Sequence, residues 1–195
     1  MFILIILLVW ALGGIAYYFL RNPDNKPEPP KHIDEIQGYN YQLSSNATEL
    51  LKTEFKVLKT VLESEEIDEE AYVKSISKLF VIDLYTINNK LSKYDIGGLQ
   101  YVMPKALDNY KVNVMDTIYK YVEDNSDGKR LQNLPEVKSV TIKNISETEM
   151  KIDDTIYVGY KVEIEWDYVK DMDYDNKGEL TLIKADKYYY VAEKN

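Results

Sequence analysis

The sequence predicts an α+β fold in which helices pack on a curved antiparallel sheet, preceded by a transmembrane helix. Three observations carry this prediction. An uncharged apolar run occupies residues 2–20, apolar residues recur at helical spacing within 46–123, and strict alternation of apolar and polar residues begins near 136. Because the helices come first and the strands last, with no alternation between them, the sheet should be antiparallel.

Composition excludes several functional classes. The chain has 195 residues and a mass of 22.8 kDa, which suits one domain and an attachment. Its net charge of -9 has the wrong sign for a protein that neutralises phosphate backbones, so we predict no nucleic-acid partner. With no cysteine and one histidine, His32, the chain lacks the residues for disulfides, thiolate catalysis and most zinc or histidine chemistry. We therefore predict no enzyme activity, no cofactor and no metal site.

The amino-terminal run is the predicted membrane anchor. Phe2–Leu20 contains no charged residue, and as a helix it would extend about 28 Å, close to the thickness of a bilayer's hydrocarbon core. Tyr17 and Tyr18 stand where aromatic rings favour the membrane interface. The alternative is a cleaved signal peptide, which usually has basic residues before the apolar run and a small-residue cleavage site after it. The sequence has neither, so a single-pass cell-membrane protein is predicted.

Basic residues on one flank predict the orientation of this helix. Arg21, Lys26 and Lys31 follow the apolar run, and no Lys or Arg precedes it. The positive-inside rule then places the rest of the chain in the cytoplasm, with an extracytoplasmic domain as the alternative. Residues 21–40 hold four of the six prolines and are predicted to be a semi-rigid spacer, with the folded domain at 41–195.

Three helices are predicted within residues 46–123. Asn46 and Glu49 match a capping box, which would start the first helix. An acidic stretch precedes the second helix, predicted from about Asp68 to Leu91, because negative charge stabilises a helix amino terminus. The third follows Pro104, a residue favoured in the first turn.

The sheet is predicted over residues 136–193. Ile156–Tyr168 alternates most clearly, with apolar residues on one face and charged residues on the other. Neighbouring strands start at Val140 and Gly178. Because a strand of this length rarely stays straight, we expect a bend or bulge, with Gly159 as its position.

Four residues are candidates for a ligand site between helices and sheet. Asp83 falls beside the apolar stripe of the second helix, where it is either a pocket acid or a carboxylate at the edge of the stripe, solvated or bonded to a tyrosine hydroxyl. A concave sheet lined by aromatic rings could bind an apolar small molecule or lipid, with Asp83, Tyr110, Trp166 and Tyr168 supplying polar groups. The alternative is a filled core, since aromatic stripes at strand spacing usually pack.

One acidic turn resembles the opening of a calcium loop. Asp171, Asp173 and Asp175 alternate as calcium ligands do, but Asn176 replaces the required glycine and Leu182 replaces the final bidentate glutamate. A solvated hairpin turn is the better interpretation, and no calcium site is predicted.

The order of these segments is similar to that of a known superfamily. An apolar amino-terminal helix, a proline-rich spacer, a central VIDLYTINNKLSKYDIGGLQYVMPKALDNY and a terminal sheet resemble the cone-shaped nuclear-transport-factor-like domains over residues 39–193. The anchored layout resembles bacterial relatives of the motor-tethering subunit of the mitochondrial inner-membrane translocase, through Leu91, Asp95 and Leu99. A second resemblance is to the bitopic scaffold component of type IV secretion systems. Enzymes of the superfamily commonly pair Asp with His in the cone, and this chain has no His there.

These inferences predict a non-catalytic, membrane-tethered protein-interaction domain, such as a scaffold subunit of a transport or envelope assembly. The anchor, the spacer and the lack of catalytic residues motivate this hypothesis, and its partner would be another protein of that assembly. The alternative is a module that binds a small molecule or lipid in the cone.

Overall fold

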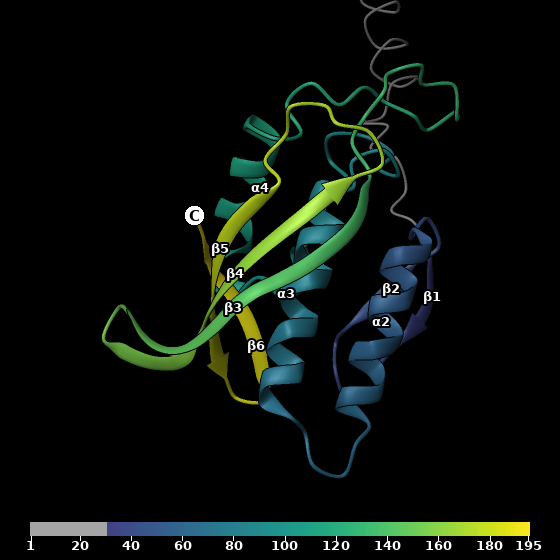
Figure 1. Cartoon of the computed structure of the whole chain (residues 1–195). Coiled ribbons are helices and arrows are strands. Elements are labelled where there is room, and N and C mark those ends of the chain that lie inside the picture. Colours follow the sequence, from purple (N-terminus) through teal and green to yellow (C-terminus); the bar gives the residue numbers. More distant parts are fainter. Residues whose placement is uncertain (1–30) are drawn as a thin grey trace, which may run out of the picture.

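A helical half precedes a sheet half in residues 31–195, the part of the chain that the computed structural model describes (Figure 1). This order confirms the predicted α+β class. The helices are α2 (Glu49–Leu62), α3 (Glu69–Tyr85) and α4 (Leu107–Asp116), with 3₁₀ turns η1 (Leu99–Tyr101) and η2 (Pro104–Ala106). The strands are β1 (His32–Glu35), β2 (Gln42–Ser44), β3 (Val137–Ile152), β4 (Thr155–Tyr168), β5 (Lys177–Ala185) and β6 (Tyr188–Lys194).

The predicted transmembrane helix, Phe2–Leu20, lies outside the described residues. Within residues 31–195, no helix combines the length and the apolar character needed to cross a membrane.

The main sheet is antiparallel, as predicted, and its four strands form a meander in the order β3-β4-β5-β6. It is curved, and the helices pack on it: α2 lies against α3, and α3 contacts all four strands. Alternation along β4 divides its faces, so that Val162, Ile164 and Trp166 are buried while the residues between them are exposed. The layers are held together by the burial of apolar residues from both halves. These include Leu58, Val73, Ile76, Leu79, Ile82, Val162, Leu180 and Leu182.

The register of the main sheet shifts at two places along β3 and once between β5 and β6, at Thr181/Leu182, and not at Gly159, so the prediction of a bulge at that glycine is wrong. The register between β3 and β4 shifts between Val137 and Ser139 and again between Ile142 and Asn144. Gly159 instead allows β4 and β5 to approach each other closely. A Cβ atom built there would lie 1.9 Å from the backbone oxygen of Leu182 on β5.

The first helix starts later than its predicted capping box. Thr48 is the N-cap of α2, and its side chain accepts a hydrogen bond from the Leu51 amide at 3.3 Å. Asn46 is engaged elsewhere: its amide nitrogen donates to Asn89 O at 2.9 Å, and the Asn89 side chain returns a bond to Asn46 O. This reciprocal pair ties the entry of α2 to the loop after α3, which explains why Asn46 does not cap.

The second and third helices end earlier than predicted because tertiary hydrogen bonds compete with the helix. After Tyr85, the amides of Ile87 and Asn88 both donate to Pro135 O, at 2.9 and 3.0 Å. The helix therefore cannot continue to Leu91. Similarly, α4 stops at Asp116, which leaves the predicted helical limit of 123 too long by seven residues. Beyond it the backbone turns Tyr119 into the core, where its hydroxyl donates to Leu84 O.

Part of the predicted spacer belongs to the folded domain. Strands β1 and β2 form a small hairpin over residues 32–44, although the spacer was predicted to extend to residue 40. Ile36 and Tyr41 are each 1% exposed, and the Tyr41 hydroxyl lies 2.7 Å from that of Tyr72 on α3. The predicted spacer therefore ends before this hairpin, which packs through apolar residues that are few but fully buried.

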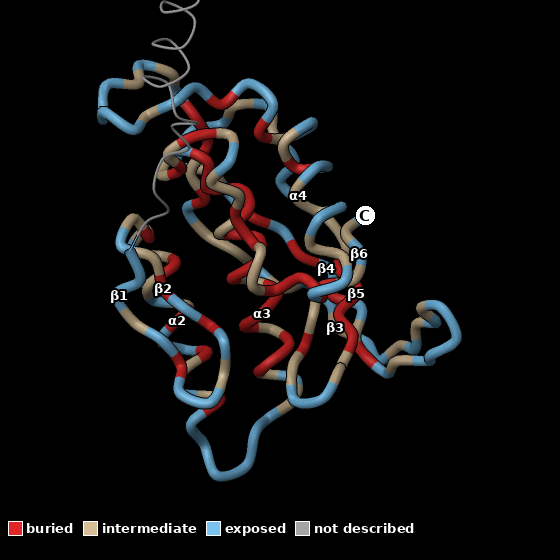
Figure 2. The backbone as a smooth tube through the Cα atoms, turned by 180° about the vertical axis from the view of Figure 1, so that it is seen from behind, coloured by how far each residue is buried: buried red, intermediate tan, exposed pale blue. Residues whose placement is uncertain are grey.

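The ends of β3 and β4 project beyond the helices as a two-stranded arm, which we define as residues 147–160 (Figures 1 and 2). In the arm, the apolar face of β4 is no longer covered by the helices. Ile156 and Val158 are 64% and 58% exposed, whereas the equivalent positions 162 and 164 are buried. The sequence pattern predicted one continuous dry face, but α3 is too short to cover all of it.

Candidate functional site

Two of the predicted site residues, Asp83 and Tyr110, meet at the loop that contains the double glycine, Gly97 and Gly98. Asp83 Oδ1 accepts from Lys90 Nζ at 2.6 Å, and its Oδ2 accepts from the Gly98 amide at 2.7 Å. The Tyr110 hydroxyl donates to Gly97 O at 2.8 Å. Burial, with nearby Tyr119 and Asp83, raises the pKa of Tyr110 well above its ordinary value, so its hydroxyl stays protonated. Asp83 therefore fastens the loop to α3, and Tyr110 fastens it to α4.

The other two predicted residues, Trp166 and Tyr168, form a second hydrogen-bonded group. Trp166 Nε1 donates to the Tyr168 hydroxyl at 2.9 Å, and that hydroxyl donates to Asp175 O. The ring of Trp166 lies 4.7 Å from that of Tyr85 on α3. Together these contacts hold the connection between β4 and β5, the segment that contains the acidic turn, against the core.

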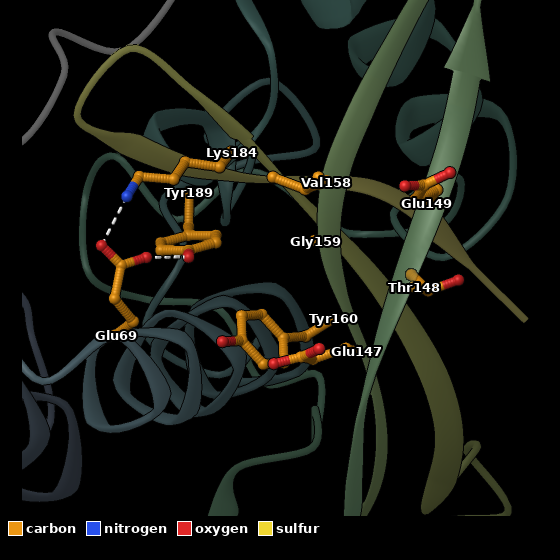
Figure 3. Close-up of a pocket in the computed structure, with 9 residues that line it drawn as sticks. All are labelled: Glu69, Glu147, Thr148, Glu149, Val158, Gly159, Tyr160, Lys184 and Tyr189. Atoms are coloured by element: carbon orange, nitrogen blue, oxygen red, sulfur yellow. Dashed lines mark hydrogen bonds and ion pairs between the residues drawn. The ribbon is translucent and has the colours of Figure 1, made fainter.

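A groove that the sequence did not predict lies between the amino end of α3 and the arm (Figure 3). Its volume is about 440 Å³. It is open to solvent and has two sides: α3, β5 and β6 form one, and the arm forms the other. We call it the arm groove and define it by Glu69, Glu147, Thr148, Glu149, Val158, Gly159, Tyr160, Lys184 and Tyr189.

Glu69 organises the first side of the arm groove. It is the first residue of α3, directly after the N-cap Asp68, whose carboxylate accepts from the Ala71 amide at 2.9 Å. Glu69 Oε1 accepts from Lys184 Nζ, and its Oε2 accepts from the Tyr189 hydroxyl (Figure 3). Lys184 and Tyr189 are directly opposite each other on β5 and β6, so strand pairing places both donors at the same carboxylate.

The pKa values of this group follow from its contacts. Burial acts to raise the pKa of Glu69, but the hydrogen bonds from Lys184 and Tyr189 outweigh it and hold the pKa below its ordinary value of 4.5. Burial, then the hydrogen bond to the Glu69 carboxylate, raises the pKa of Tyr189. At neutral pH Glu69 is therefore a carboxylate and Tyr189 a protonated phenol.

Glu69 should give the fold a pH dependence. Because the folded pKa is lowered, the carboxylate stabilises the folded state above pH 4.5, and this stabilisation is lost as the pH falls through the lower folded pKa. We expect the urea midpoint of the unmodified chain to decrease more between about pH 5 and about pH 3 than that of a Glu69→Gln variant. Parallel midpoint curves for the two proteins would contradict this assignment.

The arm supplies the second side of the arm groove. In the register of β3 and β4, Glu147 is opposite Tyr160 and Glu149 is opposite Val158. Both carboxylates are exposed, and neither takes part in an ion pair within residues 31–195. Burial, followed by the charge of Glu147, raises the pKa of Tyr160. The arm therefore presents an acidic row on β3 beside an apolar row on β4.

Residues 31–195 contain no group of three His, Cys, Asp or Glu side chains that could hold a metal ion. His32 is exposed at the start of β1. Asp171 and Asp173 lie in the connection between β4 and β5, where Asp173 adopts a positive φ of 58° and its amide donates to Asp171 Oδ1. This is the geometry of a local turn.

Comparison with known proteins identifies no relative. No family model, no curated protein and no solved structure matches this chain. The resemblance to nuclear-transport-factor-like domains therefore stays a prediction, and the functional proposal rests on the geometry of the arm groove.

The arm groove could have been found only in part from sequence. Apolar alternation marked Val158 and Tyr160, and the acidic stretch before α3 ends near Glu69. Their juxtaposition depends on how far the arm extends past α3, which a sequence pattern does not encode.

Proposed function

We propose that this protein is a non-catalytic interaction domain, held at a membrane by Phe2–Leu20, that binds a partner protein through its arm groove. The observation that supports this proposal is the exposure of Ile156 and Val158, at 64% and 58%, on a strand face beside a concave surface. Adjacent exposed apolar residues on regular structure are typical of protein-interaction sites, because a partner that covers them removes their apolar area from water.

The contacts within the arm groove favour binding over chemistry. Both Glu69 carboxylate oxygens accept hydrogen bonds, from Lys184 and Tyr189, so a general base there would first have to break two charge-assisted bonds. The same contacts make the first side of the arm groove rigid, which lowers the entropic cost of docking a partner.

A photo-crosslinking residue at position 158 of the full chain tests the proposal. We expect one protein adduct, with the same identity in repeated experiments, that a second substitution, Ile156→Ser, reduces. The matched control carries the crosslinker at position 163, an exposed site on the opposite face of the same strand. Equal adducts at both positions, or a co-purifying small molecule in native mass spectra and no protein adduct, would contradict the interaction function.

Truncation separates the proposed tether from the folded domain. A chain that begins at Lys31 should leave the membrane fraction and remain folded, because the hairpin is retained. A chain that begins at Tyr41 lacks Ile36 and should lose about 2 kcal/mol or more of unfolding free energy, the value of burying one such side chain. Membrane fractionation measures the release of the Lys31 chain, and urea denaturation measures the stability of both truncated chains. Membrane association of the Lys31 chain would contradict the tether, and equal midpoints would contradict the structural role of the hairpin.

A further inference from the structure

We propose that the arm groove binds a segment that is both cationic and apolar, such as an amphipathic peptide stretch rich in Lys or Arg. This inference rests on the proposed interaction function and adds the chemistry of the partner. The inference is supported by an acidic row and an apolar row of side chains on the arm, and by the pairing of Lys184 with Glu69 on the opposite side of the arm groove.

The charges of the arm groove are not balanced. Three carboxylates line it, those of Glu69, Glu147 and Glu149, against a single ammonium from Lys184. That ammonium is already paired with Glu69. Glu147 and Glu149 are left as the charges available to a ligand, and they attract cations and repel anions. An anionic lipid surface is therefore a poor occupant of this site.

The apolar row fixes the second property of the ligand. Val158 and Tyr160 are two residues apart on β4 and therefore share a face, which Ile156 continues toward the tip. Glu147 is opposite Tyr160 and Glu149 is opposite Val158, at the distance of neighbouring strands, about 5 Å, whereas Ile156 is opposite Lys151, so the acidic row accompanies the apolar row only as far as Val158. A peptide with an apolar stripe over β4 would place Lys or Arg side chains over β3.

Aromatic rings add a further preference for cations. The rings of Tyr160 and Tyr189 lie 5.9 Å apart across the arm groove, and Lys184 Nζ already lies 5.8 Å from the Tyr189 ring centroid. Guanidinium and ammonium groups are attracted to such faces. From Ile156 to Tyr160 the apolar row extends about 13 Å, which corresponds to two or three turns of a docked helix.

Peptide binding to the full chain in zwitterionic nanodiscs tests the inference. The probe is a fluorescein-labelled amphipathic peptide of leucine and lysine, followed by anisotropy and corrected for empty nanodiscs. We expect the double variant Glu147→Gln/Glu149→Gln to raise the Kd about tenfold, and Val158→Ser to raise it further. The matched control, Glu163→Gln/Glu165→Gln, removes the same charge from the opposite face and should leave the Kd within about twofold.

Three outcomes would overturn the inference: no binding of the peptide, equal weakening by both double variants, or equal binding of a leucine–glutamate peptide. All substituted glutamates are exposed, and circular dichroism verifies that each variant is folded. The crosslink at position 158 separates this inference from the proposed function. If Glu147→Gln/Glu149→Gln leaves that adduct unchanged, the arm groove is an interaction site but its ligand is not cationic. If the unmodified arm gives no adduct, the interaction function itself is wrong.

Discussion

Alanine at position 97 should lower the free energy of unfolding by about 3 kcal/mol or more. A Cβ atom on Gly97 would lie 1.9 Å from Asp83 O and 2.4 Å from Asp83 C, which are backbone atoms in the last turns of α3. The helix cannot yield, because the neighbouring Ile82 and Leu84 are 0% and 2% exposed. The loop would have to move away and give up its own hydrogen bonds to α3.

Gly128→Ala provides the matched control for this prediction. Gly128 has a φ of 71°, and nothing lies within 4 Å of the position that an added methyl group would take, so alanine there meets backbone strain and no collision. We expect a loss of about 1 kcal/mol. Urea denaturation with a common m-value measures both variants. If Gly97→Ala is no more destabilising than Gly128→Ala, the close approach of this loop to α3 is wrong.

Lys90→Met should be almost as damaging, with a loss of about 3 kcal/mol. The Lys90 side chain is 6% exposed and its partner Asp83 20% exposed, with 2.6 Å between Nζ and Oδ1. Methionine fills similar volume, but it leaves the Asp83 carboxylate poorly solvated and facing an apolar group. The cost comes from that unpaired charge, since a buried pair adds little stability over a well-packed apolar replacement.

A double-mutant cycle tests this explanation. In Asp83→Asn/Lys90→Met no charge remains buried, and the asparagine oxygen can still accept from the Gly98 amide. We expect the double variant to be more stable than Lys90→Met alone, with an interaction energy of about 1 kcal/mol or more. Additive losses would show that the two side chains do not depend on each other.

Sequence reasoning succeeded where one physical effect dominated. Alternation at Val162, Ile164 and Trp166 identified β4 because a two-residue period has no other common explanation. Apolar residues at three- and four-residue spacing located α2 and α3, because this spacing is typical of a helix with one buried face. Helix ends were less accurate because contacts distant in sequence decided them, as with Pro135 O and the amides after Tyr85.

Candidate site residues were identified as polar groups among apolar ones, and this criterion does not distinguish a ligand site from a structural network. Asp83 and Tyr110 each form a hydrogen bond with a residue of a loop, and Trp166 forms one with the side chain of Tyr168. The partners of Asp83 and Tyr110 are near in space and cannot be predicted from sequence spacing. The arm groove was missed for the opposite reason, since Glu147 and Glu149 are ordinary exposed residues until the arm places them beside Val158.

The small amino-terminal hairpin determines how the domain responds to mechanical force. Lys31 O accepts from the Ser45 amide at 2.7 Å, and His32 is opposite Ser44, so the two strands are joined at their open end. Traction through the preceding residues would peel β1 from β2 one bond after another, instead of shearing all bonds together. The hairpin would therefore yield first, up to the anchored Ile36, and extend the chain by about 17 Å while the sheet stays intact.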